Sequence, residues 1–390
     1  GSSLKQWRSE LHDLVNDMPL AAFFQIFFLA LVPLCAAVDD ENDPLACATD
    51  SGSNLFLQLA VQVDTQEENE LQKLVSLLLL IRKECVRGTE ACLPALAELR
   101  FAVWPRVESE GNFSSPPWMP GARFDQIFLE DSQAIGESGT KTMFFRHIFK
   151  AAGLNVHANL QQVTTNFRRL SYSKFCRKFH RTDPANRTAF TFVRHPISRF
   201  ISGYAEIEYR TRVGALWPSM DFMARKLKGY PVGSHERIAV FFEEFFRSGI
   251  KNDGHVRPQL EFLLPNGCSI PMGLVGKTER LEEDWAKIFA IQNRTGTEFD
   301  SELAVHSHGD RDKDAMESFL GLGSAKRSSN DGASAPNRHK YVRVLCWLYL
   351  ADFVVFEYEL PDECQQEPMQ SAIALVRKAS AHNFMIQDEV

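Results

Sequence analysis

A β-prone run that passes directly into a helix is the feature that most constrains the fold of this chain. Residues 188–193 read TAFTFV, and Arg194, His195 and Pro196 follow without an intervening loop. Proline is favoured in the first turn of a helix, so this junction predicts a strand over 188–193 and a helix over 196–211. A strand joined to a helix in this way is typical of α/β proteins, in which helices cover both faces of a mainly parallel sheet.

The alternation of strands and helices extends along the chain from residue 123. Hydrophobic periodicity, with glycine and proline as breakers, predicts strands over 124–129 and 269–275 and helices over 142–152, 281–291 and 341–356. Gly153 would close the first of these helices. Residues 306–338 are rich in Gly, Ser and Asp and predict a mobile loop. The expected fold class is therefore α/β, with a mainly parallel sheet flanked by helices.

Charge and cysteine content argue against a general nucleic-acid-binding protein and against a metal-binding protein. The chain has 43 Lys and Arg against 50 Asp and Glu, a net charge of −7. General nucleic-acid binding requires clustered Lys and Arg, so no nucleic-acid partner is predicted and an anionic ligand needs a local basic pocket. The eight cysteines form neither a CxxC pair nor a Cys/His zinc pattern, so no metal site is predicted. They fit lumenal disulfides and buried thiols equally well.

An uncharged apolar segment, residues 19–38, determines the expected compartment. A helix of its 20 residues spans about 30 Å, the thickness of a bilayer core. Lys5 and Arg8 precede it, so the positive-inside rule keeps the N-terminus cytosolic and sends the rest of the chain into the lumen. A cleaved signal peptide and a buried core helix are the alternatives. Glycosylation acceptor sequences agree with a lumenal domain and lie at Asn112, Asn186 and Asn293.

A glycine-rich segment, GESGTKT over residues 136–142, is the first candidate for ligand binding. If it opens the predicted helix, the free N–H groups of the helix start point toward a bound anion. Ser138, Thr140 and Thr142 would add hydroxyl donors and Lys141 a positive charge. The spacing is not that of a Walker A motif. A glycine-rich capping turn without a ligand accounts for the segment as well.

The strand–helix junction is the second candidate. Arg194 leaves the carboxyl end of a strand, where open α/β sheets bind ligands, and its guanidinium suits a phosphate group. Ser202 lies eight residues further along, about two helical turns, so it can face the same ligand. Ordinary surface charges at a strand–helix junction are the alternative.

At these two segments the chain resembles the Golgi carbohydrate sulfotransferases, especially the branch of the chondroitin and dermatan enzymes. The resemblance implies a P-loop-like three-layer fold and 3′-phosphoadenosine 5′-phosphosulfate (PAPS) as sulfuryl donor. In that family a short loop before a helix binds the 5′-phosphosulfate, and an Arg–Pro–Ser segment binds the 3′-phosphate. The matching residues are Ser138, Gly139, Thr140 and Thr142 for the loop and Arg194, Pro196 and Ser202 for the second segment.

Further matches to this family follow in the same order, so that the resemblance covers about residues 123–360. HVRPQ at 255–259 resembles a His-x-x-Pro-Gln stretch, and GKTERL at 276–281 resembles a Gly-Lys-x-Glu-x-Leu stretch. YLADFVVFEY at 349–358 resembles the family's closing Tyr-x-x-Asp-x-x-x-Phe-x-Tyr signature. Several motifs in one order make the resemblance more specific than any one of them.

The glycine-rich segment departs from the family at one position. The family has a Lys or Arg two residues before the loop glycine, in contact with the departing sulfate oxygen, where this chain has Glu137. Lys141 is expected to supply the missing cation, which makes it a catalytic candidate. His255 is the first choice for the base that takes the acceptor's proton. The other candidates for that base are His157, His180, Glu206 and Glu208.

The sequence therefore predicts a PAPS-dependent sulfotransferase whose acceptor is a hydroxyl group, with a carbohydrate as the expected substrate. A P-loop-like nucleotide-dependent kinase and a non-catalytic lumenal binding protein on the same fold are the alternatives. The expected location is the Golgi membrane, as a single-pass type II protein. The expected parts are an N-terminal tail (1–18), a transmembrane segment or signal anchor (19–38), a stem and helical region with a Pro-rich linker (39–122), the catalytic domain (123–365) and a C-terminal tail (366–390).

The predicted topology can be tested in intact microsomes. We expect the region after residue 38 to resist added protease until detergent opens the membrane, because that region would lie in the lumen. Immunoblotting with an antibody against the C-terminal domain measures this protection. Digestion without detergent would contradict the topology, and release of soluble protein starting near Val38 would support a cleaved signal peptide.

Overall fold

The computed structural model describes residues 50–89, 91–111, 133–138, 141–214, 218–247, 253–264, 269–291, 298–303, 310–322 and 335–387. The chain divides into two compact units, Gly1–Asn69 and Glu70–Val390. The predicted membrane segment 19–38 and the predicted strand 124–129 lie outside the described residues. Within the described ranges, no helix has both the length and the apolar character that crossing a bilayer requires.

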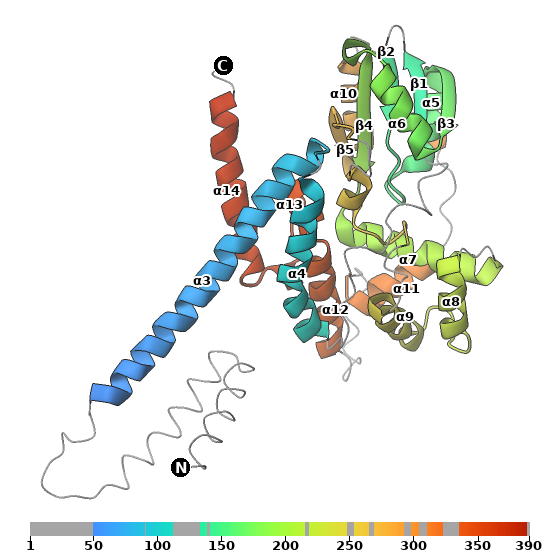
Figure 1. Ribbon diagram of the computed structural model, residues 1–390. Coiled ribbons are helices and arrows are strands. Elements are labelled where there is room, and N and C mark those ends of the chain that lie inside the picture. Colours follow the sequence, from blue (N-terminus) through green and yellow to red (C-terminus); the bar gives the residue numbers. More distant parts are fainter. Residues whose placement is uncertain are drawn as a thin grey trace, which may run out of the picture. The chain divides into compact units, whose positions relative to one another are not determined.

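The second unit contains a five-stranded mixed sheet with the strand order β3-β1-β2-β4-β5 (Figure 1). Strands β2, β4 and β5 are parallel, and β1 pairs antiparallel with both β2 and β3. The predicted α/β fold class is confirmed, with the parallel part limited to three strands. The strands are β1 Gln133–Ser138, β2 Lys141–Phe145, β3 Thr165–Leu170, β4 Arg187–Val193 and β5 Leu274–Lys277.

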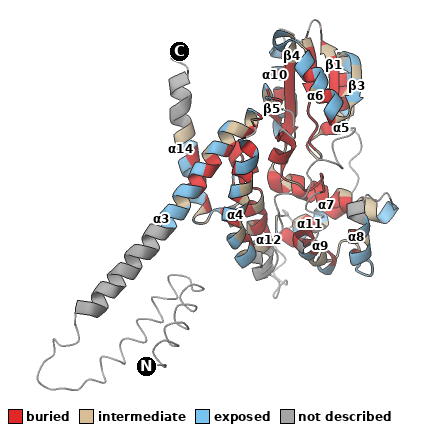
Figure 2. Ribbon diagram, in the orientation of Figure 1, coloured by how far each residue is buried: buried red, intermediate tan, exposed pale blue. Residues whose placement is uncertain are grey.

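Strand β4 shows why the sheet is covered on both faces. Successive side chains of a strand point to opposite faces, and those of β4 are buried on both. Phe190 and Phe192 pack into one hydrophobic cluster with Trp285, whereas Ala189 and Val193 pack into the other. Figure 2 shows this burial as red strands between helices. The predicted strand over 188–193 is confirmed.

The helices that the structure describes begin and end as follows. They are α3 Asp50–Val86, α4 Cys92–Gly111, α5 Gly153–Val163, α6 Tyr172–Arg181, α7 Pro196–Val213, α8 Pro218–Leu227, α9 His235–Arg247, α10 Leu281–Ala290, α11 Asp310–Leu320, α12 Ala335–Leu348, α13 Leu350–Val355 and α14 Met369–Gln387. The predicted helices over 196–211 and 281–291 are confirmed as α7 and α10.

Three predicted elements need correction. The single helix over 341–356 is two helices, α12 and α13, separated at Tyr349. The mobile loop over 306–338 contains a regular helix, α11, whose inner face buries Met316 and Phe319. The strand predicted over 269–275 is β5, which begins later than predicted, at Leu274.

The helix predicted over 142–152 is wrong, and this correction moves the candidate site. Residues 141–145 form strand β2, and α5 begins only at Gly153. Met143 and Phe145 pack on one face of the sheet and Phe144 on the other, the alternation of a strand rather than the single stripe of a helix. Gly153 therefore starts a helix instead of ending one.

The sequence left open whether the cysteines are paired, and the structure contains disulfides. Cys85 bonds Cys92 where α3 gives way to α4, and Cys346 bonds Cys364. Disulfides persist in oxidising compartments, so these bonds agree with a lumenal or extracellular environment.

Candidate active site

The candidate active site lies where parallel strands β2 and β4 end. Phe145 of β2 is in register with Phe190 of β4, so the segments after both strands emerge at the same edge of the sheet. Neighbouring strands are about 4.8 Å apart, which brings the two segments close together. Ligands of open α/β sheets bind at the carboxyl ends of parallel strands.

The segment after β2, residues 146–152, leads into the N-terminus of α5. Lys150 and Ala152 adopt left-handed φ angles of 65° and 56°, a conformation that costs energy for residues other than glycine. Ala152 is the N-cap of α5 and gives no side-chain cap, so no N-cap side chain occupies the N–H groups that open the helix. A Cβ at Gly153 would lie 1.9 Å from the ring of His147, so this position requires glycine.

Lys150 carries the positive charge of this loop. Its Nζ lies 3.1 Å from Oε2 of Glu206 on α7, and the other oxygen of Glu206 accepts a hydrogen bond from Arg210 at 2.6 Å. Burial lowers the pKa of Lys150, and the charge of Glu206 partly opposes this shift. Burial raises the pKa of Glu206, but Lys150 and Arg210 outweigh it and bring that pKa down to about 2. Lys150 and Glu206 therefore form an ion pair at the end of the loop.

Arg194, at the start of the segment after β4, is held through both its side chain and its backbone. Its Nη1 donates to Oγ of Ser202 at 3.1 Å. The side-chain amide of Gln259 accepts from the N–H of Arg194 at 2.8 Å and donates to its carbonyl at 2.7 Å. Burial lowers the pKa of Arg194 and Glu279 opposes this shift. An arginine remains charged in such a setting, so a half-buried cation lies at the end of β4.

His255 is oriented by a neighbouring carboxylate. Its Nδ1 lies 2.6 Å from Oδ1 of Asp253, and the same oxygen accepts the backbone N–H of His255 at 2.9 Å. This contact fixes the ring and directs its other nitrogen, Nε2, away from Asp253. The His255 ring is 5.0 Å from that of Phe149, the residue before Lys150. A Cβ at Gly203 of α7 would lie 2.1 Å from the carbonyl oxygen of His255, so α7 and this turn are in close contact.

Arg199 of α7 joins the turn of His255 to the loop of Lys150. Its Nε donates to the carbonyl of Phe149 at 2.9 Å, and its Nη2 donates to the carbonyl of Gly254 at 2.8 Å. The side chain is almost fully buried. A buried guanidinium needs such acceptors, and here they fix the two segments relative to each other.

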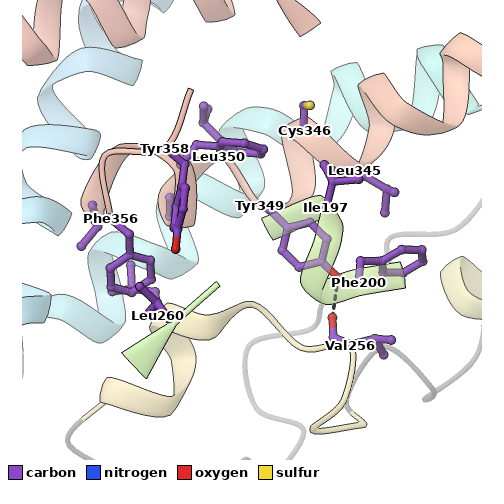
Figure 3. Close-up of a cluster of buried hydrophobic side chains, with 14 of the residues drawn as sticks. Ile197, Phe200, Val256, Leu260, Leu345, Cys346, Tyr349, Leu350, Phe356 and Tyr358 are labelled. Atoms are coloured by element: carbon purple, nitrogen blue, oxygen red, sulfur yellow. Dashed lines mark hydrogen bonds between the residues drawn. The ribbon is translucent and has the colours of Figure 1, made fainter. Parts of the chain in front are cut away.

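The closing signature, residues 349–358, stabilises the stretch that carries His255. The carboxylate of Asp352 accepts the backbone N–H groups of Gln259 at 2.7 Å and Leu260 at 2.9 Å. The hydroxyl of Tyr349 donates to the carbonyl of Val256, as the dashed line in Figure 3 shows. The His-x-x-Pro-Gln stretch is thus fixed at both ends by the last motif of the chain.

Glu279, of the Gly-Lys-x-Glu stretch, connects the same parts. Its Oε1 accepts the backbone N–H of His195 at 2.7 Å, and its Oε2 accepts the hydroxyl of Tyr358 at 3.0 Å. The downstream motifs therefore meet at the Arg194 junction, although Glu279 is 84 residues from His195 and 79 residues from Tyr358 in the sequence.

The glycine-rich segment does not precede a helix. Ser138 ends β1 and pairs with Lys141 of β2, whose Nζ donates to the carbonyl of Ile291 at 3.2 Å. Thr142 lies within β2, and Gly139 and Thr140 lie outside the described residues. The structural premise for a donor loop at 138–142 is therefore wrong.

Glu137 is accounted for by the same hairpin. Its Oε2 accepts a hydrogen bond from Asn166 at 2.6 Å across the β1–β3 pair.

Lys150 was not identified from the sequence, because Gly153 fits the end of a helix as well as its start. The β-prone run Met143–Phe145 followed by a Lys-Ala-Ala-Gly turn was the signal for a strand, a loop and a new helix.

The remaining candidates for the base have other surroundings. Glu208 is buried and bonds the guanidinium of Arg237 at 2.8 Å. His157 packs within α5 against the ring of Phe145, and His180 is exposed near the end of α6. Of the candidate bases, His255 and Glu206 approach the loop of Lys150.

Comparison with family models matches the Sulfotransferase family over residues 137–359, more than half of the chain. The chain therefore belongs to this family, which includes the Golgi carbohydrate sulfotransferases. Family membership implies PAPS-dependent sulfuryl transfer to a hydroxyl acceptor. Comparison with the curated proteins and with the solved structures gives no significant match.

The role of Asp352 can be tested with Asp352→Asn. An amide has one acceptor oxygen and a donor group that would face an N–H, so one of the two N–H groups loses its partner, at a cost of about 1–3 kcal/mol. We expect denaturant unfolding to show this loss of stability, together with weaker binding of adenosine 3′,5′-bisphosphate. Asp314→Asn, at an exposed position of α11, is the control and should leave both unchanged. Unchanged stability in Asp352→Asn would contradict the role.

Proposed function

We propose that the loop 146–152 and the start of α5 bind the 5′-phosphosulfate of PAPS, while Arg194 and Ser202 bind its 3′-phosphate. The observation that supports this most is the position of Lys150. It follows a parallel strand, precedes a helix without a side-chain cap and lies at the same sheet edge as Arg194. The donor carries anionic groups at both ends of its ribose, and the site offers a cation on each of two adjacent strands.

The donor set of the site fits such a ligand. An anion at the start of α5 gains from the backbone N–H groups and from the helix dipole. Arg194 and Ser202 supply a guanidinium and a hydroxyl within hydrogen-bond distance of each other, a combination suited to one phosphate. The donor phosphosulfate would compete with Glu206 for the ammonium of Lys150.

In this proposal His255 is the general base and Lys150 stabilises the leaving group. Asp253 holds Nδ1 of His255, so Nε2 takes the proton from the acceptor hydroxyl as its oxygen bonds to sulfur. The bond between sulfur and the bridging oxygen breaks, and the electron pair stays on the departing phosphate. Lys150 stabilises the charge that develops on that oxygen. The products are the sulfated acceptor and adenosine 3′,5′-bisphosphate.

The acceptor we propose is a carbohydrate hydroxyl, and the compartment is the Golgi lumen. The disulfides Cys85–Cys92 and Cys346–Cys364 support an oxidising compartment, and residues 19–38 would anchor the chain in the membrane as a single-pass type II protein. Product mass spectrometry on a panel of glycans, with a tyrosine peptide and a small alcohol for comparison, tests the acceptor class. Sulfation of the peptide alone would contradict a carbohydrate acceptor.

Lys150→Ala tests the catalytic role of the loop. We expect turnover to fall by about 100-fold or more, because the lost cation acts on charge that develops in the transition state. Binding of adenosine 3′,5′-bisphosphate should change far less, as calorimetry can measure. Lys141→Ala is the matched control and should keep nearly normal turnover. The reverse pattern, with turnover lost only in Lys141→Ala, would return the catalytic role to the β1–β2 hairpin.

Glu206→Gln tests the electrostatics of the pair. The carboxylate opposes the lowering of the pKa of Lys150 by burial, so its removal lowers that pKa further. Lys150 then loses its proton at lower pH, and the alkaline limb of the pH–rate profile should move to lower pH. Glu206→Asp, which keeps the charge, should move the limb less. An unchanged alkaline limb in Glu206→Gln would show that the ion pair does not control turnover.

A further inference from the structure

Helix α6 exposes a stripe of positive charge. Tyr172, Phe175 and Phe179 form its buried face. The outer face carries four cations at the spacing i, i+3, i+4 and i+7, which aligns them along one side of a helix over about 10 Å. These exposed residues, here named the α6 stripe, are Lys174, Arg177, Lys178 and Arg181.

Among the residues that the structure describes, the α6 stripe has no paired counter-charge. Within the described part of the chain, none of its four side chains forms an ion pair. Like charges at these spacings destabilise a helix. The helix dipole favours cations in the last turn but disfavours Lys174 in the first. The stripe therefore has a cost in the isolated protein that a bound anion would remove.

The neighbouring edge strand extends the charge. Arg168 and Arg169 of β3 are both exposed, and β3 is the last strand on its side of the sheet. Leu170 packs into the same hydrophobic cluster as Phe175 and Phe179, so α6 covers the face of β3 that also bears Arg168. Residues 165–181 contain no acidic residue, in a chain whose net charge is −7.

The α6 stripe begins next to the candidate active site. The hydroxyl of Tyr172, the first residue of α6, accepts a hydrogen bond at 3.1 Å from Nη1 of Arg146, the first residue of the loop that carries Lys150. The α6 helix and the sheet end that bears this loop are neighbours in Figure 1. A chain-like ligand that reaches the loop can continue along α6.

We propose that the α6 stripe, with Arg168, binds an anionic polysaccharide that carries sulfate or carboxylate groups. Charge complementarity selects a polyanion, and the disulfides favour a compartment in which glycans, rather than nucleic acids, are the extended polyanions. Membrane binding by a helix requires apolar side chains beside the cations, whereas Tyr172, Phe175 and Phe179 are at most 8% exposed. That the bound chain is also the sulfate acceptor rests on the proposed function.

The test compares two triple variants that each remove one arginine and two lysines. Lys174→Gln/Arg177→Gln/Lys178→Gln alters the stripe. Arg87→Gln/Lys228→Gln/Lys378→Gln alters exposed cations elsewhere and is the charge-matched control. Calorimetry measures the binding of a chondroitin sulfate decasaccharide at two salt concentrations. We expect the stripe variant to bind about tenfold more weakly and with a smaller salt dependence, and the control to stay within about twofold of the unaltered protein.

Parallel titrations separate the inference from the proposed function. All three proteins should bind adenosine 3′,5′-bisphosphate equally, which shows an intact donor site. The stripe substitutions should leave the binding of phosphatidylserine vesicles unchanged. Equal decasaccharide affinity in both variants would overturn the inference, as would binding through the stripe to vesicles but not to the decasaccharide. Loss of donor-product binding or of sulfate transfer in the unaltered protein would instead count against the proposed function.

Discussion

The guanidinium of Arg199 is the contact on which the geometry of the candidate site depends. It is buried and donates to the carbonyls of Phe149, Gly254 and Arg257, so it links the segment after β2 to the turn that carries His255. Burying a charge is costly unless its donors are satisfied, and these carbonyls satisfy them. The strained loop of Lys150 is thus attached to α7, the helix that also carries Glu206 and Ser202.

A second set of contacts joins motifs that are far apart in the sequence. Asp352 fixes the backbone of Gln259, and Gln259 fixes the backbone of Arg194. Burial raises the pKa of Asp352 to about 6, although the N–H groups of Leu260 and Gln259 oppose this rise. The closing signature therefore supports the backbone of Arg194, in the proposed donor site, through two successive sets of hydrogen bonds.

Sequence patterns predicted the parts of the site that follow local rules. The β-prone run 188–193 and Pro196 determined β4 and α7, and they brought Arg194 and Ser202 together. The loop of Lys150 was not predictable in the same way, because Gly153 fits the end of a helix as well as its start. Long-range packing decides between the two, since Phe144 and Phe145 enter cores on opposite faces of the sheet. Arg199 acts through backbone carbonyls, and Asp253 acts through the ring and the backbone N–H of His255. These contacts carry no sequence signature.

The central claim is that the donor binds at the loop after β2 and not at the hairpin before it. Hydrogen exchange followed by mass spectrometry, with and without adenosine 3′,5′-bisphosphate, tests this claim most directly. The account predicts slower exchange of backbone N–H groups in peptides that cover 146–156 and 194–202, and unchanged exchange in peptides that cover 133–142. Protection confined to 133–142, with unchanged exchange at 146–156, would contradict it.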